Sequence, residues 1–346
     1  MAVTRIDIDE FISMASKNLV LDVRSPKEYH HAHYPGALSV PLFSDEERKE
    51  VGTTYKQKSR EQAIKIGLDY FGPKMRSVVS RVEKELSKRG SRSAIVHCWR
   101  GGMRSGAVAW LLDLYGFQVY RLDGGYKKFR NWALAQFEKP YQLQILGGYT
   151  GSGKTEILHE FESRHQAVVD LEGLAGHRGS AFGNLNNIPQ PSTEQFENEL
   201  ALKLYHISQR YENPLIWVES ESSRVGNVNV PFRFFNQMKV ASRINIEVPF
   251  EKRLAFIIQS YGHYDIDRMI AATRRIKKRL GGLNMQQTIA YLQENDLQNA
   301  FSILLNYYDK AYDKSRKKFR GGSRSVNAVD TDPQRNADHI LKQIEH

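Results

Sequence analysis

The chain has 346 residues, a net charge of +11 and a pI near 9.5, and Cys98 is its only cysteine. A single cysteine excludes an internal disulfide, a Cys-x-x-Cys redox pair and a cysteine-based zinc site. No stretch has the apolar character of a signal peptide or the length of a membrane span, so we expect a cytoplasmic protein without membrane contact. The length predicts two domains, and we expect a monomer.

The first part of the chain alternates short apolar strands with helical stretches. The predicted strands cover 19–23, 37–40, 94–96 and 118–120, and the predicted helices cover 10–16, 74–89 and 105–114. Strands separated by helices indicate a parallel sheet with helices on both faces. We therefore expect a first α/β domain over residues 1–138, with reactive residues at the carboxyl ends of its strands.

Cys98 follows one of these strands and precedes a helix. Backbone N–H groups and the helix dipole at such a turn favour a thiolate, and nearby arginines add positive charge. A lone cysteine can instead be a small buried hydrophobe, but the glycines and arginines favour a nucleophile. Selenium or sulfur on this thiol would pass to a substrate or leave with an external reductant. The expected anion-binding residues of the loop are Trp99, Arg100, Gly101, Gly102, Met103 and Arg104.

A second α/β pattern begins near residue 139. Its predicted strands cover 143–146, 167–170, 215–219 and 244–248, a helix is predicted at 156–162, and the chain is mostly helical from 251 to about 312. We expect this domain to cover residues 139–320. After Lys314 the composition is polar, and we expect residues 321–346 to form a loosely ordered tail.

Gly-x4-Gly-Lys-Thr between a strand and a helix is the pattern of a phosphate-binding loop. Its backbone N–H groups converge on phosphate oxygens, its lysine adds a charge, and its threonine can reach a Mg²⁺ ion. The loop selects phosphate and not the attached group, so ATP, GTP and other diphosphate esters are all open. The expected diphosphate-binding residues are Gly148, Gly151, Ser152, Gly153, Lys154 and Thr155.

Charged residues after the neighbouring strands are candidates for a second set of contacts. Carboxylates there can hold Mg²⁺, water or a substrate proton, and cations can meet a charged leaving group. A structural loop with a surface histidine explains the glycine-rich segment after residue 170 equally well. The candidates are Asp170, Glu172, His177, Arg178 and Glu219.

Positive charge is concentrated near the C-terminus, where residues 251–346 hold 17 Lys and Arg against 11 Asp and Glu. Such clusters attract nucleic-acid phosphates. Tyrosines near Lys314–Arg320 can stack on unpaired bases, or at helical spacing can belong to the core. The expected nucleic-acid-binding residues are Arg274, Arg275, Lys277, Lys278 and Arg279.

Asp22–Tyr29, His33–Ala37 and Leu122–Gly125 resemble the signatures of rhodanese domains. The cysteine loop is one residue longer than in ordinary sulfurtransferases, which implies a wider anion pocket. His-Cys-x5-Arg-Ser is also the protein tyrosine phosphatase signature. A rhodanese domain followed by a P-loop domain with Leu171–Ala175 resembles, over residues 5–320, the tRNA 2-selenouridine synthase family.

The resemblance implies a rhodanese-like parallel-sheet domain, a P-loop NTPase-like domain with a helical C-terminal part, and a reaction in two steps. Geranyl diphosphate would first alkylate the sulfur of wobble 2-thiouridine. Selenium derived from selenophosphate and carried on Cys98 would then displace the geranyl thiol. It also implies tRNAs of the Lys, Glu and Gln type, a selenophosphate-producing enzyme as partner, and no tightly bound cofactor.

Other readings of the same motifs are open at this point. In an ATP-dependent tRNA sulfurtransferase, the P-loop would adenylate a base and Cys98 would carry a persulfide. A tyrosine-phosphatase-like enzyme could be fused to a nucleotide-binding module. A regulatory rhodanese could use its P-loop only to sense nucleotide.

Overall fold

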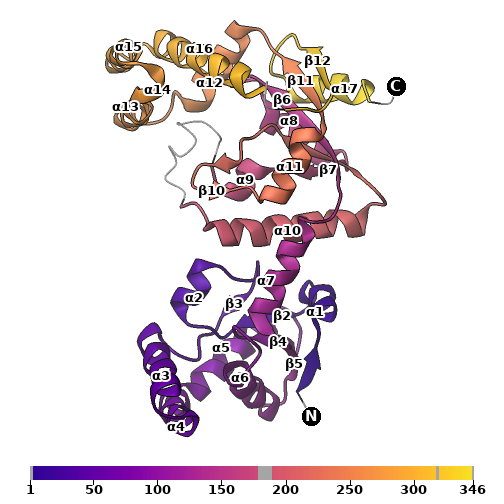
Figure 1. Ribbon diagram of the computed structural model, residues 1–346, viewed down its shortest axis with the longest axis vertical. Coiled ribbons are helices and arrows are strands. Elements are labelled where there is room, and N and C mark those ends of the chain that lie inside the picture. The colour runs from indigo at the N-terminus through magenta and orange to yellow at the C-terminus, as the bar shows by residue number, and fades with distance from the viewer. Residues whose placement is uncertain (1–2, 178–188, 317–318, 345–346) are drawn as a thin grey trace. The chain divides into compact units, whose positions relative to one another are not determined.

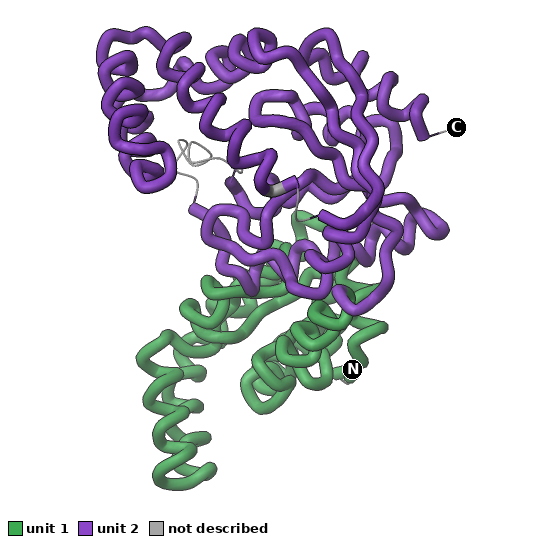
Figure 2. The backbone as a smooth tube through the Cα atoms, turned by 45° about the horizontal axis from the view of Figure 1, so that its top comes forward, with its two compact units in different colours: residues 1–136 green, residues 137–346 purple. Residues whose placement is uncertain are grey.

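The computed structural model describes the chain except residues 1–2, 178–188, 317–318 and 345–346. Two compact units divide it, Met1–Gln136 and Phe137–His346 (Figure 2). The division lies close to the boundary expected near residue 138. Each unit contains a five-stranded parallel sheet, which confirms the α/β class.

Unit 1 has the strand order β1-β5-β4-β2-β3. Its strands are β1 (Thr4–Ile6), β2 (Leu19–Asp22), β3 (Leu38–Ser39), β4 (Ser93–His97) and β5 (Gln118–Leu122). Its helices are α1 (Ile8–Ala15), α2 (Pro26–His31), α3 (Asp45–Gln57), α4 (Arg60–Phe71), the 3₁₀ turn η1 (Gly72–Lys74), α5 (Met75–Lys88), α6 (Met103–Leu114) and α7 (Gly125–Gln136). The four strands expected from apolar runs are confirmed. Strand β1, at the edge of the sheet, was not expected.

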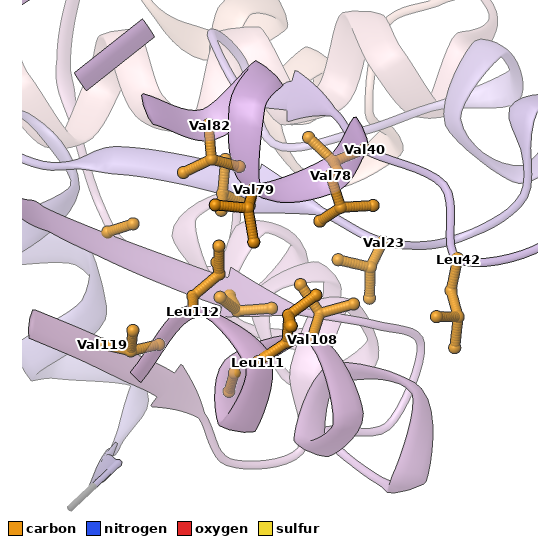
Figure 3. Packing of buried hydrophobic residues seen from close by; sticks show 14 of the residues in the cluster. Val23, Val40, Leu42, Val78, Val79, Val82, Val108, Leu111, Leu112 and Val119 are labelled. Atoms are coloured by element: carbon orange, nitrogen blue, oxygen red, sulfur yellow. The ribbon is translucent and has the colours of Figure 1, made fainter. Parts of the chain in front are cut away.

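The core of unit 1 follows from helical and strand periodicity. Every residue of β2 is buried, as expected for a central parallel strand that is covered on both faces. Valines of α5 and apolar residues of α6 pack together in one buried cluster (Figure 3). Cys98 belongs to the same cluster. The labelled side chains from these helices are Val78, Val79, Val82, Val108, Leu111 and Leu112.

Helices α3 and α4 form a hairpin that the sequence analysis did not predict (Figure 1). Ser44 begins α3 with a capping box, in which its side chain accepts from the backbone of Glu47 and the Glu47 carboxylate accepts from the backbone of Ser44. Thr54 is the only buried residue of α3, so the helix lacks the apolar stripe that usually reveals an amphipathic helix.

Unit 2 has the strand order β12-β11-β6-β8-β7, with a separate hairpin of β9 and β10. Its strands are β6 (Gln142–Gly148), β7 (Ala167–Val169), β8 (Leu215–Glu219), β9 (Arg224–Val225), β10 (Val228–Asn229), β11 (Ser242–Glu247) and β12 (Ser323–Asn327). Its helices are α8 (Lys154–Ser163), α9 (Leu171–Ala175), α10 (Thr193–Arg210), α11 (Phe232–Val240), α12 (Phe250–Tyr261), α13 (Ile266–Arg275), α14 (Lys277–Leu280), α15 (Gly282–Gln293), α16 (Leu297–Arg316) and α17 (Pro333–Lys342).

The segment expected as a loosely ordered tail, residues 321–346, instead completes the sheet of unit 2. Strand β12 pairs in parallel with β11, and α17 packs against α8 (Figure 1). Ala337 and Ile340 are fully buried in the same cluster as Phe161. The polar composition concealed this structure because β12 is an edge strand whose only buried residue is Val326.

No helix in the described part of the chain is long and apolar enough to cross a membrane.

Candidate active sites

Cys98 lies where the sequence analysis placed it, directly after β4 and before α6. Strand β4 lies between β5 and β2, so the cysteine is at the carboxyl edge of the middle of the sheet, where α/β enzymes place reactive groups. Its side chain is only 3% exposed. A buried thiol at this edge is protected from bulk solvent but next to the loop that follows it.

The glycines of the Leu122–Gly125 signature allow a close approach to the cysteine loop. Gly125 has φ +57°, and a Cβ there would lie 2.3 Å from the Cys98 carbonyl oxygen. Gly101 has φ +66°, and a Cβ there would lie 2.6 Å from the Leu122 carbonyl oxygen. Both positions therefore require glycine. Their contact lets the N–H of Tyr126 donate to the Cys98 carbonyl at 2.8 Å, which fixes the loop against the start of α7.

The surroundings of Cys98 favour its thiolate. Burial opposes ionisation, but the Ser105 hydroxyl, the charge of Arg104 and the backbone N–H groups of Ser105 and Arg100 outweigh it, and the pKa of the thiol is lowered. Ser105 Oγ lies 3.3 Å from Sγ and 3.1 Å from the Gly102 carbonyl oxygen. The hydroxyl proton can therefore turn from the carbonyl to the sulfur when the thiol ionises. Ser105 was not among the predicted site residues, although it ends the predicted loop.

Arg104, which the sequence predicts to bind an anion, instead forms an ion pair within the protein. Its Nη1 donates to the Glu28 carboxylate at 2.8 Å, and Arg48 Nε lies 3.6 Å from the same oxygen. Although burial opposes ionisation, these arginines lower the pKa of Glu28, so the pair stays charged. Arg104 thus acts on the thiol through its charge while Glu28 holds its side chain. Arg100 is exposed.

A buried ion pair lies beside the loop. Arg24 Nε donates to both oxygens of Asp22 at 3.0 Å, and its guanidinium lies 3.8 Å from the centre of the Tyr126 ring. Asp22 and Arg24 begin the first rhodanese-like signature, and both are buried. They therefore support the start of α7 and do not face a substrate.

A cleft of about 630 Å³ opens beside Cys98. Its walls are the cysteine loop and the part of α3 from Arg48 to Gln57, so the unpredicted hairpin borders the nucleophile. The lining residues from α3 and its approach are Phe43, Arg48, Lys49, Val51, Gly52, Thr53, Tyr55, Lys56 and Gln57, and those from the loop are Cys98, Trp99, Arg100, Gly102, Met103 and Arg104.

The phosphate loop of unit 2 joins β6 to α8 as predicted. Gly151 and Gly153 have φ +81° and +75°, which a residue with a side chain rarely adopts. Lys154 Nζ donates to the Gly148 carbonyl at 3.0 Å, so the lysine folds over the loop. The first backbone N–H groups of α8 then point to where a phosphate binds.

Two helices brace this loop through contacts that the sequence did not reveal. Arg253 of α12 is buried, donates to the Thr150 carbonyl at 3.1 Å, and makes a two-pronged ion pair with Asp309 of α16 at 2.9 and 2.7 Å. Tyr312 of α16 accepts from the Gly148 N–H at 2.7 Å. The helical C-terminal part is therefore tied directly to the phosphate loop.

Carboxylates form one wall beside the loop. Glu172 Oε2 accepts from the Thr155 hydroxyl at 3.4 Å, and the Glu172 N–H donates to Glu219 at 2.7 Å. Glu221, which the sequence analysis missed, lines the same cleft. Burial and the neighbouring carboxylates raise the pKa of Glu219 well above its usual range, and burial and Glu172 raise that of Glu221 to about 8.

The other second-site candidates have different positions. Asp170 caps α9, because its Oδ1 accepts from the Gly173 N–H at 2.7 Å, and it is absent from the cleft lining. This is a structural role that the sequence did not distinguish from a catalytic one. The backbone N–H of His177 donates to the backbone carbonyl of Glu172 at 3.0 Å. Arg178 lies outside the described residues.

Opposite the carboxylates, α12 and α16 supply an aromatic and aliphatic wall to a cleft of about 380 Å³. The tyrosines near Lys314–Arg320, which are Tyr307, Tyr308 and Tyr312, are half-buried in this wall. Tyr307 and Tyr308 also pack against the hydrophobic core of the helical part. The wall residues are Phe256, Ile257, Tyr261, Tyr307, Tyr308, Ala311 and Tyr312. Over the described residues, no group of three or more His, Cys, Asp or Glu has the arrangement to hold a metal ion.

The five cations predicted to bind tRNA are exposed, on the last turn of α13 and on α14. Arg279 also lines the cleft of the phosphate loop. Among the basic residues between Lys314 and Arg320, Arg316 Nη1 lies 3.5 Å from a carboxylate oxygen of Glu247. Residues 317–318 lie outside the described part of the chain.

Comparison with known proteins finds a family match for each unit of the chain. The family model of the tRNA 2-selenouridine synthase AAA domain matches residues 141–332, and that of the rhodanese-like domain matches residues 7–131. A tRNA 2-selenouridine synthase from Hydrogenovibrio crunogenus is 35% identical over 90% of this chain and 92% of its own length. Those from Sulfurovum sp. and Nitrosomonas europaea are 32% and 36% identical over 92% and 74% of this chain, and over 96% and 67% of their own lengths. The chain belongs to the tRNA 2-selenouridine synthase family.

Proposed function

We propose that this enzyme converts wobble 2-thiouridine in tRNA to 2-selenouridine in two steps, one at each cleft. The phosphate loop binds geranyl diphosphate, and the uridine sulfur is alkylated there. Cys98 then carries selenium derived from selenophosphate and delivers it to the same uridine. The observation that carries the proposal is the presence, in one chain of this family, of a phosphate-binding cleft without any thiol and a thiolate cleft without a phosphate loop.

In the first step the uridine sulfur attacks C1 of the geranyl group, and the diphosphate leaves with the electrons of the C1–O bond. Lys154 and the N–H groups at the start of α8 supply positive charge where the leaving group becomes more negative. The uridine N3 proton is lost as the sulfur is alkylated. The ionised form of Glu221 is a suitable acceptor, because a carboxylate with a pKa of about 8 is a stronger base than an ordinary carboxylate.

Thr155 is the residue on which a Mg²⁺ ion would fit, because its hydroxyl lies beside the Glu172 carboxylate and Mg²⁺ prefers oxygen ligands. When bound, the ion would neutralise part of the diphosphate charge. The aromatic wall of α12 and α16 provides apolar surface for the chain of the donor.

In the second step, selenide-level selenium from selenophosphate is first loaded on Cys98 Sγ. A small-molecule disulfide takes up the two electrons released when the Sγ–Se bond forms, and is reduced to two thiols. The selenium bound to Cys98 Sγ then attacks C2 of the alkylated base. The C2–Se bond forms, the C2–S bond breaks, and the geranyl thiolate leaves with its electron pair and takes a proton from solvent. An external thiol must then supply two electrons to cleave the Se–Sγ bond, because the chain has no second cysteine. The lowered pKa of Cys98 keeps its sulfur in the reactive form.

The exposed cations of α13 and α14 are proposed to contact tRNA phosphates. Arg279 links this surface to the cleft of the phosphate loop. The positive charge is expected to attract tRNA in general rather than to read its sequence.

The test is mass spectrometry of nucleosides from 2-thiouridine tRNA after incubation with geranyl diphosphate, and then with selenophosphate in a mixture of a small-molecule thiol and its disulfide. S-geranyl-2-thiouridine should form first and 2-selenouridine second. A strict requirement for ATP would favour the sulfurtransferase alternative. Hydrolysis of aryl phosphates without tRNA or selenium, and no nucleoside products, would favour the phosphatase alternative.

A further inference from the structure

The cleft beside Cys98 has apolar walls that the chemistry of selenium transfer does not explain. Tyr55 of α3 is 50% exposed, and Met103 and Trp99 of the cysteine loop are 51% and 36% exposed. All three line the cleft together with Cys98. Large apolar side chains that converge on a reactive group and stay exposed indicate a ligand with an apolar part.

We propose that this cleft contains a subsite for the S-alkyl chain of the modified uridine, formed by Tyr55, Val51, Trp99 and Met103. The inference rests on the proposed function, because only an alkylated substrate carries such a chain to Cys98. The selenium donor is small and charged and needs no apolar wall. The volume of about 630 Å³ is that of a site for a medium-sized organic group.

Helix α3 suits this role through the spacing of its residues. Val51 and Tyr55 are one helical turn apart and therefore share a face, and both line the cleft. The helix is anchored next to these residues, because Glu47, one turn before Val51, pairs with Lys74, and Thr54, beside Tyr55, is buried. Val51 is half-buried and also packs against the core of unit 1, so it holds the wall in place as well as lining the cleft.

Charge around the same cleft fits the polyanion to which the alkyl group is attached. Lys49 and Lys56 of α3 and Arg100 of the loop are exposed and line the cleft. Cations of this kind can meet the phosphates next to the uridine, while the apolar side chains meet the alkyl chain. The arrangement explains why a single cleft has both kinds of lining.

The experiment compares two synthetic anticodon stem-loops, one with S-geranyl-2-thiouridine and one with S-ethyl-2-thiouridine. Selenation kcat/KM and binding without selenium, followed by fluorescence anisotropy, are measured for the full chain, for Tyr55→Ser and for Met103→Ser. The matched control is Leu68→Ser, an exposed apolar residue of α4 that does not line the cleft. All three side chains are exposed, so the fold should survive these changes.

The full chain should prefer the geranyl stem-loop in both measurements. The preference should fall about tenfold in Tyr55→Ser and in Met103→Ser, the scale of one lost apolar contact, and should persist in Leu68→Ser. An unchanged preference in both cleft variants, or an equal affinity of the full chain for both stem-loops, would overturn the subsite. Failure of the full chain to selenate either stem-loop would contradict the proposed function instead, and the binding preference would still decide the subsite.

Discussion

The two clefts control charge in opposite ways. Around Cys98, Arg104 and the donors of the loop outweigh burial, and the pKa of the thiol is lowered. Around the phosphate loop, burial and crowded carboxylates raise the pKa of Glu219 and Glu221. Both clefts nevertheless begin with glycine-dependent turns between a strand and a helix.

This difference indicates what each cleft is built to hold. A site that lowers the pKa of its own thiol keeps an anion on the protein, ready to act as a nucleophile. A site whose carboxylates hold protons near neutral pH adds little negative charge of its own, and therefore tolerates an anion that the substrate brings. The same local motif therefore supports opposite roles, because residues from other elements set the charge.

The strongest way to separate the two clefts is to remove the thiol. Cys98→Ser should abolish selenation and leave S-geranylation at its normal level, because serine has no accessible anion and the phosphate loop is in the other unit. Nucleoside mass spectrometry with each donor in turn measures both steps. Selenation by Cys98→Ser at the normal rate would disprove the carrier role.

The reciprocal change removes the charge of the phosphate loop. Lys154→Ala should lower kcat/KM for geranylation roughly 10- to 150-fold, because losing a charged hydrogen-bond partner costs about 1.5–3 kcal/mol. Selenation of tRNA that already carries S-geranyl-2-thiouridine should be retained. Lys252→Ala, an exposed lysine of α12, is the matched control. Equal losses in both steps would show that the clefts are not separate in function.

A third set of substitutions tests which of the two units binds tRNA. Neutralising the five cations of α13 and α14 to Gln should weaken tRNA binding and reduce the log–log salt slope by up to about 0.7–0.9 per lost contact. In a second variant that keeps Arg279, which also lines the cleft of the phosphate loop, the affinity for geranyl diphosphate should change little. The control neutralises five exposed cations of α5 and its end in unit 1, with the same change in charge: Arg76, Arg81, Lys84, Lys88 and Arg89. Equal effects of both variants would point to net charge and not to a binding surface.

The smallest expected effect concerns the pH dependence of stability. Glu221 has an ordinary pKa of 4.5 and a folded-state pKa of about 8. Between these values the folded chain keeps a proton that the unfolded chain has lost, so this group makes stability fall as pH rises, by at most about 1.4 kcal/mol per pH unit. The substitution Glu221→Gln removes this pH-dependent loss of folding stability, because glutamine does not titrate.

The Tm of Glu221→Gln minus that of the unmodified chain should therefore increase from pH 5 to pH 8. Thermal unfolding in EDTA measures this difference, and Glu212→Gln, at an exposed position, is the control. A constant difference across this pH range would show that Glu221 is not held protonated.

The sequence by itself determined the features that depend on neighbouring residues. The strands before Cys98 and before the phosphate loop, the glycines that permit both turns, and the α/β class could all be predicted, because hydrophobic periodicity and backbone conformation are local properties. The same local information identified Lys154 and Cys98 as chemical groups and placed them at the carboxyl ends of strands.

Only the tertiary structure decided how those groups are surrounded. Arg104 pairs with Glu28, Arg253 with Asp309, and β12 with β11, and in each case the partners are far apart in the chain. Asp170 caps a helix while Glu221 enters the cleft, although both are acidic residues that follow a strand. Periodicity cannot reveal such pairs, because burial, charge and hydrogen bonding at a site are set by whatever the fold brings together.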